Sequence, residues 1–395
     1  MNDINLMLGD CLERLRELPD NSIDAVVTDP PYGLSFMGKK WDYDVPSVEI
    51  WAECLRVLKP GGHLLAFAGT RTQHRMAVRI EDAGFEIRDM IAWVYGSGFP
   101  KSLDVSKAID KAAGVEREVV GVAGKSGSVR NSMAGDFAGG EYMETAPATE
   151  AAQQWDGWGT ALKPALEPIT VARKPLIGTV AANVLEHGTG AINVNGCRVG
   201  DFVNTTPSGV DRRNAVLAEA GYRPGAYQMG QTTPNGAQGR WPANLIHDGS
   251  QMVLDLFPEA NSARANGNPN NPKRGTNHTA TSYGQGDGKV THDYRDSGSA
   301  ARFFYCAKTA KKDREEANNH PTVKPTDLMR YLCRLVTPLG GKVLDPFMGS
   351  GSTGKAAVKE GFGFVGIERD NAYFEIAKAR VEAAKLDMDW QNAFS

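Results

Sequence analysis

The chain has 395 residues, of which 41% are hydrophobic and 23% charged, with a formal net charge of −3, a balance typical of a globular protein with one large α/β domain and an insertion, or with two domains. No apolar run approaches the roughly 20 residues that cross a bilayer, the first residues do not resemble a signal peptide, and the five cysteines form no C-x-x-C pair. We therefore expect a cytoplasmic protein with no membrane segment, no disulfide framework and no metal site.

Apolar runs near the N-terminus predict buried strands, and stretches with apolar residues at helical spacing predict helices between them. The strands are expected at residues 5–8, 23–28, 63–68 and 85–95, and the helices at 11–18, 48–58 and 71–83. The sequence Lys59-Pro60-Gly61-Gly62 is a typical signal for the end of a helix. Alternation of strand and helix predicts a parallel sheet with helices on its faces.

Two long segments in the middle of the chain lack regular apolar patterns. Residues 96–160 contain one predicted helix, at about 105–113, and a run rich in Gly, Ser, Ala and Glu at 122–150, so we expect a mobile insertion there. The segment 161–177 contains a further predicted strand at 167–173. Residues 178–300 are rich in Gly, Asn, Thr and Pro, with apolar islands at 243–246 and 252–257, and we expect a partly ordered insertion that bears a binding surface.

Regular patterns return in residues 301–385. Strands are expected at 302–307, 342–344 and 364–367, and helices at 327–336, at 355–360 and in a final segment through about 384, which leaves a tail at 386–395. Thr326 is expected to cap the helix at 327–336. Residues 300–342 carry a net charge of +5 and residues 1–60 a net charge of −5. The basic block is suited to contact with phosphates, or it is a solvated helix face.

The tetrapeptide Asp29-Pro30-Pro31-Tyr32 follows the strand at 23–28. Two prolines cannot continue a strand, so the tetrapeptide is predicted to be a rigid loop at the carboxyl end of that strand, where open α/β sheets bind ligands. Its carboxylate, its fixed carbonyls and its aromatic ring suit the binding of a planar amine. Asp29 and the Pro30 carbonyl would each accept one N–H, while Tyr32 stacks on the ring. The same residues also fit an ordinary turn that ends a strand.

A second ligand site is predicted where the strand at 342–344 runs into the glycine-rich segment from Asp345 to Gly354, followed by a helix, a strand and Glu368. A P-loop would fit Gly349 to Lys355, but Ala356 stands where a Ser or Thr hydroxyl would bind Mg²⁺. A dinucleotide site would fit the glycine spacing from Gly349 to Gly354, but no second half that would bind the other nucleotide is evident. A cofactor with one nucleoside and no phosphate fits best, because two carboxylates would repel a phosphate but suit ribose hydroxyls and a sulfonium cation.

With both segments in view, the chain resembles an S-adenosylmethionine-dependent DNA amino-methyltransferase of the circularly permuted β class, of the kind found in prophages. The matching segments are Gly9-Asp10, the tetrapeptide, His320 to Pro325, and Asp345 to Gly354 with Glu368. The resemblance implies a doubly wound, mostly parallel, seven-stranded Rossmann-like α/β sheet with a large irregular insertion. In its terms, residues 1–95 are the catalytic half, residues 301–385 the cofactor-binding half, and residues 178–300 the target-recognition region.

The resemblance also implies roles for individual residues. The catalytic residues would be those of the tetrapeptide, Asp29, Pro30, Pro31 and Tyr32. S-adenosylmethionine would be bound by Asp10 at the adenine, by Glu368 at the ribose, by Thr322 and Lys324 at the methionine carboxylate, and on its methionine and sulfonium side by Asp345, Phe347, Gly349 and Gly351. Double-stranded DNA would be the partner, while a homodimer and a cognate restriction nuclease are left open.

The implied reaction is direct methyl transfer to an exocyclic amine of a base that has left the duplex. No cysteine follows a proline as the nucleophile of cytosine-C5 methyltransferases does, which argues against that reaction. In related enzymes Asp at the first tetrapeptide position accompanies adenine more often and Ser accompanies cytosine, so we favour adenine N6 over cytosine N4.

Other interpretations stay open: methylation of RNA or of a protein glutamine amide, a catalytically silent DNA-binding module, and a P-loop ATPase. Four tryptophans are candidates for stacking on nucleic acid, although packing in the core is favoured for them: Trp93, Trp155, Trp158 and Trp241.

Overall fold

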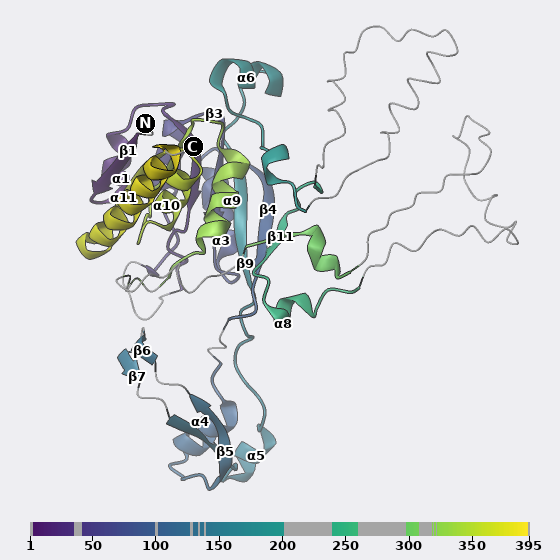
Figure 1. The fold of residues 1–395 in the computed structure, drawn as a ribbon. Coiled ribbons are helices and arrows are strands. Elements are labelled where there is room, and N and C mark those ends of the chain that lie inside the picture. Colours follow the sequence, from purple (N-terminus) through teal and green to yellow (C-terminus); the bar gives the residue numbers. More distant parts are fainter. Residues whose placement is uncertain are drawn as a thin grey trace, which may run out of the picture.

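One mixed β-sheet with helices on both faces forms the centre of the computed structural model (Figure 1). The structure describes residues 3–34, 42–98, 102–126, 129–132, 135–137, 140–200, 239–259, 298–307, 318, 320 and 322–393. Within these residues the sheet has nine strands, in the order β1-β13-β12-β2-β3-β9-β4-β10-β11. All neighbours pair in parallel except β9, which is antiparallel to both β3 and β4. The α/β class and the mostly parallel sheet are confirmed.

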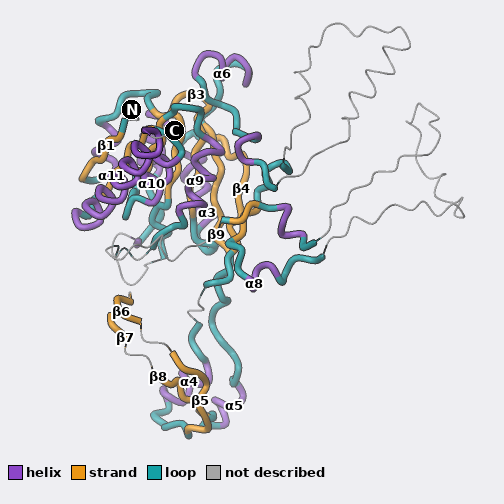
Figure 2. The backbone as a smooth tube through the Cα atoms, in the orientation of Figure 1, coloured by secondary structure: helices purple, strands orange, loops and turns teal. Residues whose placement is uncertain are grey.

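The central strands of the sheet coincide with apolar runs of the sequence, because strands buried on both faces need apolar residues at successive positions. Figure 2 shows the strands of the sheet side by side as one twisted layer. Their bounds are β1 Ile4–Leu8, β2 Ile23–Thr28, β3 Leu58–Phe67, β4 Glu86–Val94, β9 Leu166–Arg173, β10 Leu245–His247, β11 Tyr305–Cys306, β12 Lys342–Asp345 and β13 Gly363–Glu368.

The expected number of seven strands is wrong, because two short strands extend the sheet beyond β4. β10 pairs with β4 through residues 245–247, and β11 pairs with β10 through only two residues. β10 lies in the segment expected to be irregular. The strand expected at 302–307 is shorter in the structure: its first two residues belong to a 3-10 helix, Ala300–Phe303, and β11 contains only Tyr305 and Cys306. Pairings of two or three residues are set by neighbouring strands, and so no periodic pattern in the sequence reveals them.

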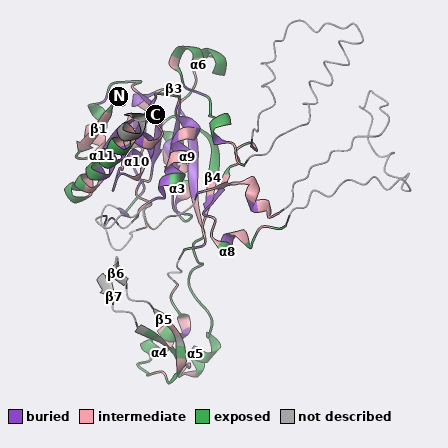
Figure 3. Ribbon diagram, in the orientation of Figure 1, coloured by how far each residue is buried: buried purple, intermediate pink, exposed green. Residues whose placement is uncertain are grey.

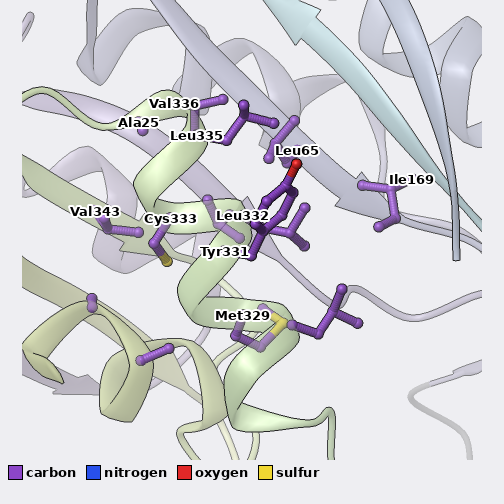
Figure 4. Close-up of a cluster of buried hydrophobic side chains, with 14 of the residues drawn as sticks. Ala25, Leu65, Ile169, Met329, Tyr331, Leu332, Cys333, Leu335, Val336 and Val343 are labelled. Carbon is purple, nitrogen blue, oxygen red and sulfur yellow. The ribbon is translucent and has the colours of Figure 1, made fainter. Parts of the chain in front are cut away.

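The two faces of the sheet carry separate layers of core residues, because successive side chains of a strand point to opposite faces. In β3, Leu65 and Phe67 belong to one layer, whereas Leu64 and Ala66 belong to the other. The first layer includes side chains of α9, Thr326–Val336, and α10, Ser352–Lys359. Figure 3 shows the sheet and the inner side of α9 as buried, and Figure 4 shows α9 side chains packed on strand residues such as Ala25 and Val343. The second layer includes residues of α1, Cys11–Arg16, α2, Val48–Val57, and α3, Gln73–Asp82.

Two predicted helix boundaries, the start of α9 and the end of the final helix, differ from those in the structure. α2 ends at Val57, within one residue of the expected end, but the Pro60-Gly61-Gly62 segment that follows it lies inside β3, which begins at Leu58. Gly61 has a φ of +78°, and the pairing of β3 with β2 shifts register at the same end of the strand. Thr326 is the first residue of α9 instead of its cap, and Pro325 occupies the cap position without a side-chain hydrogen bond. The final helix, α11, spans Asn371–Ala393 and is longer than expected.

The segment that follows β4 forms a small separate unit, which Figure 1 places away from the sheet on two connecting segments. It contains α4, Val105–Ala112, as expected, together with β5, Val119–Ser126, and its antiparallel partner β8, Gly140–Thr145. A second, shorter pair of strands follows: β6, Val129–Ser132, and β7, Gly135–Phe137. All four strands lie in or next to the run at 122–150, for which we expected no regular structure. The unit ends with α5, Glu150–Gln154.

Buried Asp110 connects the elements of this small unit. Its carboxylate accepts hydrogen bonds from the backbone of Ala148 and Thr149 at 3.0 Å and from an Arg117 nitrogen at 3.1 Å. These bonds hold the pKa of Asp110 below its ordinary value, the Ala148 amide being the largest cause. These contacts link α4 to Arg117 and to the segment that leads into α5.

The expected target-recognition region, 178–300, is described only in part. It contains α6, Val180–His187, a 3-10 turn at Asn195–Cys197, β10 and α8, Gln251–Leu254. Residues 201–238 and 260–297 of the predicted insertion lie outside the described residues. Among the helices that the structure describes, none is both long and apolar enough to span a membrane.

Candidate active site

The predicted site residues gather where three neighbouring parallel strands end. Asp29 directly follows β2, Asp345 is the last residue of β12, and Glu368 is the last residue of β13. The order β13-β12-β2 places these strand ends side by side. Parallel strands direct their carboxyl ends to the same edge of the sheet, so the edge collects three carboxylates from segments far apart in sequence.

The tetrapeptide loop is fixed by buried Asp42 as well as by its prolines. The Asp42 carboxylate accepts hydrogen bonds from the backbone N–H groups of Tyr32 at 2.6 Å and Gly33 at 2.9 Å, and its second oxygen accepts one from Leu34 at 3.2 Å. Within the loop, the Tyr32 hydroxyl donates to Asp29 Oδ1 at 2.7 Å. The aromatic ring and the carboxylate are therefore held in a fixed mutual orientation.

Two residues from distant segments complete the surroundings of Asp29. Lys324 Nζ donates to Asp29 Oδ2 at 2.6 Å and lies 3.2 Å from Glu167 Oε2. The Tyr32 hydroxyl is 3.0 Å from the same Glu167 oxygen and 3.1 Å from Lys324 Nζ. The Lys324 ammonium also lies 4.8 Å from the centre of the Phe67 ring, within the range of a cation–π contact.

The electrostatics keep Lys324 charged and Tyr32 protonated. Burial opposes the charge of Lys324, but the carboxylates of Asp29 and Glu167 outweigh it and raise the pKa of the ammonium above its ordinary value. Burial and the same two carboxylates raise the pKa of Tyr32 well above its ordinary value. The Tyr32 hydroxyl thus stays a hydrogen-bond donor throughout the physiological range.

Asp345 is buried and braces the glycine-rich loop. Its Oδ1 accepts hydrogen bonds from the Thr28 hydroxyl at 2.6 Å and the Phe347 amide at 3.1 Å, and its Oδ2 accepts one from the Thr353 hydroxyl at 2.6 Å. Burial raises the pKa of Asp345 to about 6, although these hydrogen bonds act in the opposite direction. The hydrogen bond from Thr28 connects the start of the glycine-rich loop to β2, next to Asp29. The expected contact of Asp345 with a cofactor stays a prediction.

Glu368 is anchored to the backbone of the same loop. Its Oε2 accepts a hydrogen bond from Gly349 N at 2.8 Å, and its Oε1 accepts one from Asp370 N at 2.7 Å. Burial raises its pKa. Each carboxylate oxygen has more than one acceptor site, so Glu368 retains capacity for two ligand hydroxyls.

The glycines expected to line the cofactor have backbone conformations that favour glycine. Gly349 has a φ of +52° and Gly351 a φ of +79°. A Cβ atom on Gly349 would lie 3.1 Å from the His320 ring, and one on Gly351 would lie 3.0 Å from Ala377. Neighbouring Phe347 is partly buried and packs edge-on to Trp51, with ring centres 6.2 Å apart. The loop therefore presents backbone, and not side chains, at these two positions.

Asp10 lies beside the Glu368 end of the sheet. Gly9 N donates to the Glu368 carbonyl at 2.9 Å, and Leu8 is paired with Glu368 in the sheet. Asp10 Oδ1 caps α1 through the backbone N–H of Leu12 at 2.9 Å. The structure thus brings Asp10 and Glu368 together, and the second carboxylate oxygen of Asp10 has no part in the cap.

The segment before α9 connects the two halves of the site. His320 Nδ1 bonds the backbone of Thr322 and its ring packs edge-on to Tyr373, with ring centres 4.4 Å apart. Asn318 Nδ2 donates to the Ser350 hydroxyl of the glycine loop at 3.2 Å. Thr322 is exposed. The resemblance implies that Lys324 binds the methionine carboxylate of the cofactor, and this role stays a prediction. In the structure Lys324 contacts Asp29 instead.

A comparison with protein families decides the class of this site. The model of a family described as DNA methylase, N6_N4_Mtase, matches residues 23–126 and 243–379, more than half of the chain. The chain belongs to this DNA methylase family. The match includes the tetrapeptide, Lys324 and the glycine-rich loop, the segments that meet at the sheet edge.

Individual relatives of this DNA methylase are methyltransferases. The Type II methyltransferase M.HindIII of Haemophilus influenzae is 25% identical over 293 residues, which cover 63% of this chain and 82% of that protein. The Type II methyltransferase M2.DpnII of Streptococcus pneumoniae is 35% identical over 104 residues, or 25% of this chain and 39% of that protein. Among solved structures, an M1.HpyAVI–SAM complex is 16% identical with a TM-score of 0.41, covering 96% of this chain and 98% of that chain. The PvuII cytosine-N4-specific DNA methyltransferase is 15% identical with a TM-score of 0.44, covering 96% and 86%.

Sequence analysis missed several residues of this DNA methylase site. Asp42 and Glu167 belong to no recognisable motif, and the sequence around Thr28 indicates only that it lies in a strand. The packing preference for the four tryptophans is confirmed for Trp93, which is buried, and wrong for Trp155, Trp158 and Trp241, which are exposed. The only local signal for Glu167 is its place at the start of a predicted strand.

Proposed function

We propose that this DNA methylase transfers a methyl group from S-adenosylmethionine to the exocyclic N6 amine of an adenine that has left the DNA duplex. The observation that carries the proposal is the junction of two sites: Asp29 and Tyr32 lie at the end of β2, and the glycine loop braced by Asp345 and Glu368 lies at the ends of the adjacent strands β12 and β13. Donor and acceptor of one group transfer need this proximity.

S-adenosylmethionine is the methyl donor, and the residues at the glycine loop fit it. Glu368 and Asp10 offer carboxylate oxygens to hydroxyl and amine groups of a nucleoside, and the glycine backbone allows close approach. Three carboxylates at this edge disfavour a phosphate, which distinguishes the site from that of an ATPase. When bound, the cofactor supplies an electrophilic methyl group on a positively charged sulfur.

Asp29 and the Pro30 carbonyl activate the amine. The lone pair of an exocyclic amine is delocalised into its ring, and accepting both N–H hydrogens draws the nitrogen towards tetrahedral geometry. With S-adenosylmethionine bound at the glycine loop, the freed lone pair would form the N–C bond as the S–C bond breaks and leaves its electrons on sulfur. Positive charge grows on nitrogen, so the hydrogen bond to Asp29 strengthens in the transition state. In this mechanism Asp29 then accepts the proton that the nitrogen releases.

Positioning makes the largest contribution to this mechanism. Alignment of donor and acceptor supplies on the order of 7–11 kcal/mol, and a charged hydrogen bond about 2–4 kcal/mol by analogy with donors in an oxyanion hole. Stacking on Tyr32 returns roughly 1–3 kcal/mol per base, which offsets much of the cost of unpairing it. The loop that Asp42 holds in place serves this positioning.

Adenine is favoured over cytosine because Asp29 stands at the first position of the tetrapeptide, as it does in adenine enzymes that the chain resembles. Cytosine N4 is the second candidate, since both amines are planar and both fit the same hydrogen-bond acceptors. Recognition of a target sequence by residues 178–300, a homodimer and a cognate restriction nuclease stay predictions.

The test is to incubate the purified protein with unmethylated DNA and isotopically labelled S-adenosylmethionine, then digest the DNA and analyse its nucleosides by mass spectrometry. Labelled N6-methyldeoxyadenosine is the expected product. Labelled N4-methyldeoxycytidine would keep the mechanism and correct the base. If the protein binds the cofactor but transfers no label to DNA from several sources, the proposal is contradicted. The same assay would then be applied to RNA and protein substrates.

A further inference from the structure

Glu167 lies at the edge of the sheet where the catalytic loop lies, although it comes from a strand outside the recognised motifs. It is the second residue of β9 and pairs with Trp93 near the carboxyl end of β4. Because β9 is antiparallel to β3 and β4, its first residues reach the edge at which those strands end. The reversed strand thus brings a carboxylate to the site from its amino end.

Glu167 and Asp29 share the same two partners. Lys324 Nζ is 2.6 Å from Asp29 Oδ2 and 3.2 Å from Glu167 Oε2. The Tyr32 hydroxyl is 2.7 Å from Asp29 Oδ1 and 3.0 Å from the same Glu167 oxygen. The side chain of Lys324 is 8% exposed and those of the two carboxylates are 20% exposed. Shielding from water makes these charged contacts stronger than surface ion pairs.

The formal charges of this group explain why a second carboxylate is useful. Asp29 with Lys324 alone would be a neutral pair, and the ammonium would cancel the charge that Asp29 offers to the target amine. With Glu167 included, the formal charge of the group is −1. An amine that becomes positive as its N–C bond forms is stabilised more strongly by a net negative group than by a neutral one.

We propose that Glu167 is a positioning residue of the methyl-transfer site, which takes up the charge of Lys324 and orients the Tyr32 hydroxyl so that Asp29 remains available to the target amine. The inference rests on the proposed amine methylation. It assigns no bond-making step to Glu167, which acts through Lys324 and Tyr32. Tyr95, the residue after β4, is also close to Glu167. Burial, followed by the charge of Glu167, raises the pKa of Tyr95 to about 12.

The test compares Glu167→Gln with Glu86→Gln, using the full-length protein, S-adenosylmethionine and the DNA methylated by the wild type. Glu86→Gln is a matched control, because Glu86 forms an ion pair with Arg173, at the opposite end of the same strand β9, at 2.5 Å. Each substitution removes one carboxylate charge and preserves the shape of the side chain. Glu167 lies at the end of β9 near the catalytic loop, whereas Glu86 contacts the opposite end of β9.

We expect Glu167→Gln to lower kcat by about 10- to 100-fold, the effect of losing one charged hydrogen-bonded contact. The dissociation constant of S-adenosylmethionine should change by less than about threefold, because Glu167 touches no residue of the glycine loop in the described contacts. Glu167→Asp, which keeps the charge, should recover part of the lost kcat. Glu86→Gln should leave kcat near that of the wild type.

A second measurement reports on Lys324 directly. Acetylation of lysines by acetic anhydride, followed by peptide mass spectrometry, should proceed several-fold faster at Lys324 in Glu167→Gln than in the wild type, because one of two anionic neighbours is lost. Lys59, paired with Asp24 at 2.6 Å, is the internal reference and should not change.

Three results would overturn the inference: an unchanged kcat in Glu167→Gln, an equal loss in Glu86→Gln, or weakened cofactor binding with kcat intact. Failure of the proposed function itself is a separate outcome, since then the wild-type protein would methylate no DNA amine.

Discussion

Asp29 shows at the residue scale how the site is assembled. One of its oxygens accepts a hydrogen bond from Tyr32, three residues along the chain, and the other accepts one from Lys324, 295 residues away. The near contact follows from the tetrapeptide itself. The distant one depends on the loop before α9 reaching the end of β2, and it fixes the carboxylate from its second side.

Replacement of Asp29 by alanine should reduce turnover by roughly two orders of magnitude or more, because the amine loses its charged acceptor. Binding of S-adenosylmethionine should be largely retained, since the glycine loop is held by Asp345 and Glu368 and not by Asp29. Single-turnover methylation measures the first effect and calorimetric titration the second. Turnover equal to that of the wild type would refute the mechanism.

Replacement of Glu368 by alanine should instead weaken binding of S-adenosylmethionine. The carboxylate offers acceptors to the ligand and also anchors Gly349 N, so its loss removes a contact and loosens the loop. Titration calorimetry should show that the dissociation constant rises by about tenfold or more, because a hydrogen bond to a charged group contributes about 1.5–3 kcal/mol. An unchanged affinity would remove the ribose assignment.

At the scale of elements, the turn from β12 into α10 depends on glycine for two different reasons. Gly351 needs a positive φ and also lies where a Cβ would be 3.0 Å from Ala377 in α11. Gly361, after the same helix, has an equal φ of +79°, but an added Cβ would have no heavy atom within 4 Å. The two positions therefore separate backbone strain from crowding.

Gly361→Ala should cost about 1 kcal/mol of unfolding free energy, the usual penalty for a left-handed residue with a Cβ. Gly351→Ala should cost more, by about 1–3 kcal/mol for overpacking against α11, and should also weaken cofactor binding. Urea unfolding with and without S-adenosylmethionine measures both quantities. Equal behaviour of the two variants would show that crowding at Gly351 is relieved by movement of α11.

For the whole molecule, the stability of the sheet should depend on pH through His63 in β3. Burial, reinforced by the nearby charges of Arg173 and Arg88, lowers the pKa of His63 from 6.5 to about 4. The unfolded chain therefore binds a proton that the folded chain does not between these values. Stability from this group is complete above pH 6.5 and is lost as the pH falls towards 4. Asp345 acts in the opposite direction, because its folded pKa is raised to about 6.

Comparison of the wild type with His63→Leu isolates the first effect. Between pH 7.5 and pH 5 the His63 contribution should fall by about 2 kcal/mol in the wild type and be absent in the variant. Urea unfolding gives the free energy of unfolding of each protein at the two pH values. The effect of Asp345 is the same in both proteins and cancels when the two changes with pH are subtracted. A pH dependence that is the same in both proteins would mean that His63 is charged in the folded state or accessible to water.

Local sequence patterns were enough to predict the class of the fold and both halves of the candidate site. Apolar runs marked the central strands because these are buried on both faces, and the tetrapeptide and the glycine-rich loop were evident because each needs special backbone geometry within a few residues. Such local requirements leave local patterns. The same reasoning explains why α4 was predicted, why the three-residue strand β10 was not, and why β11 was predicted with bounds longer than its two residues.

Which side chains meet at the site depends on the three-dimensional arrangement of the strands. Lys324 contacts Asp29, Glu167 reaches Tyr32 across 135 residues, and Thr28 bonds Asp345 across 317 residues. These contacts depend on the order and direction of strands, above all on the reversal of β9, which brings Glu167 to the catalytic edge. Strand order follows from the burial of two whole faces at once, a property of the complete sheet that no single segment encodes.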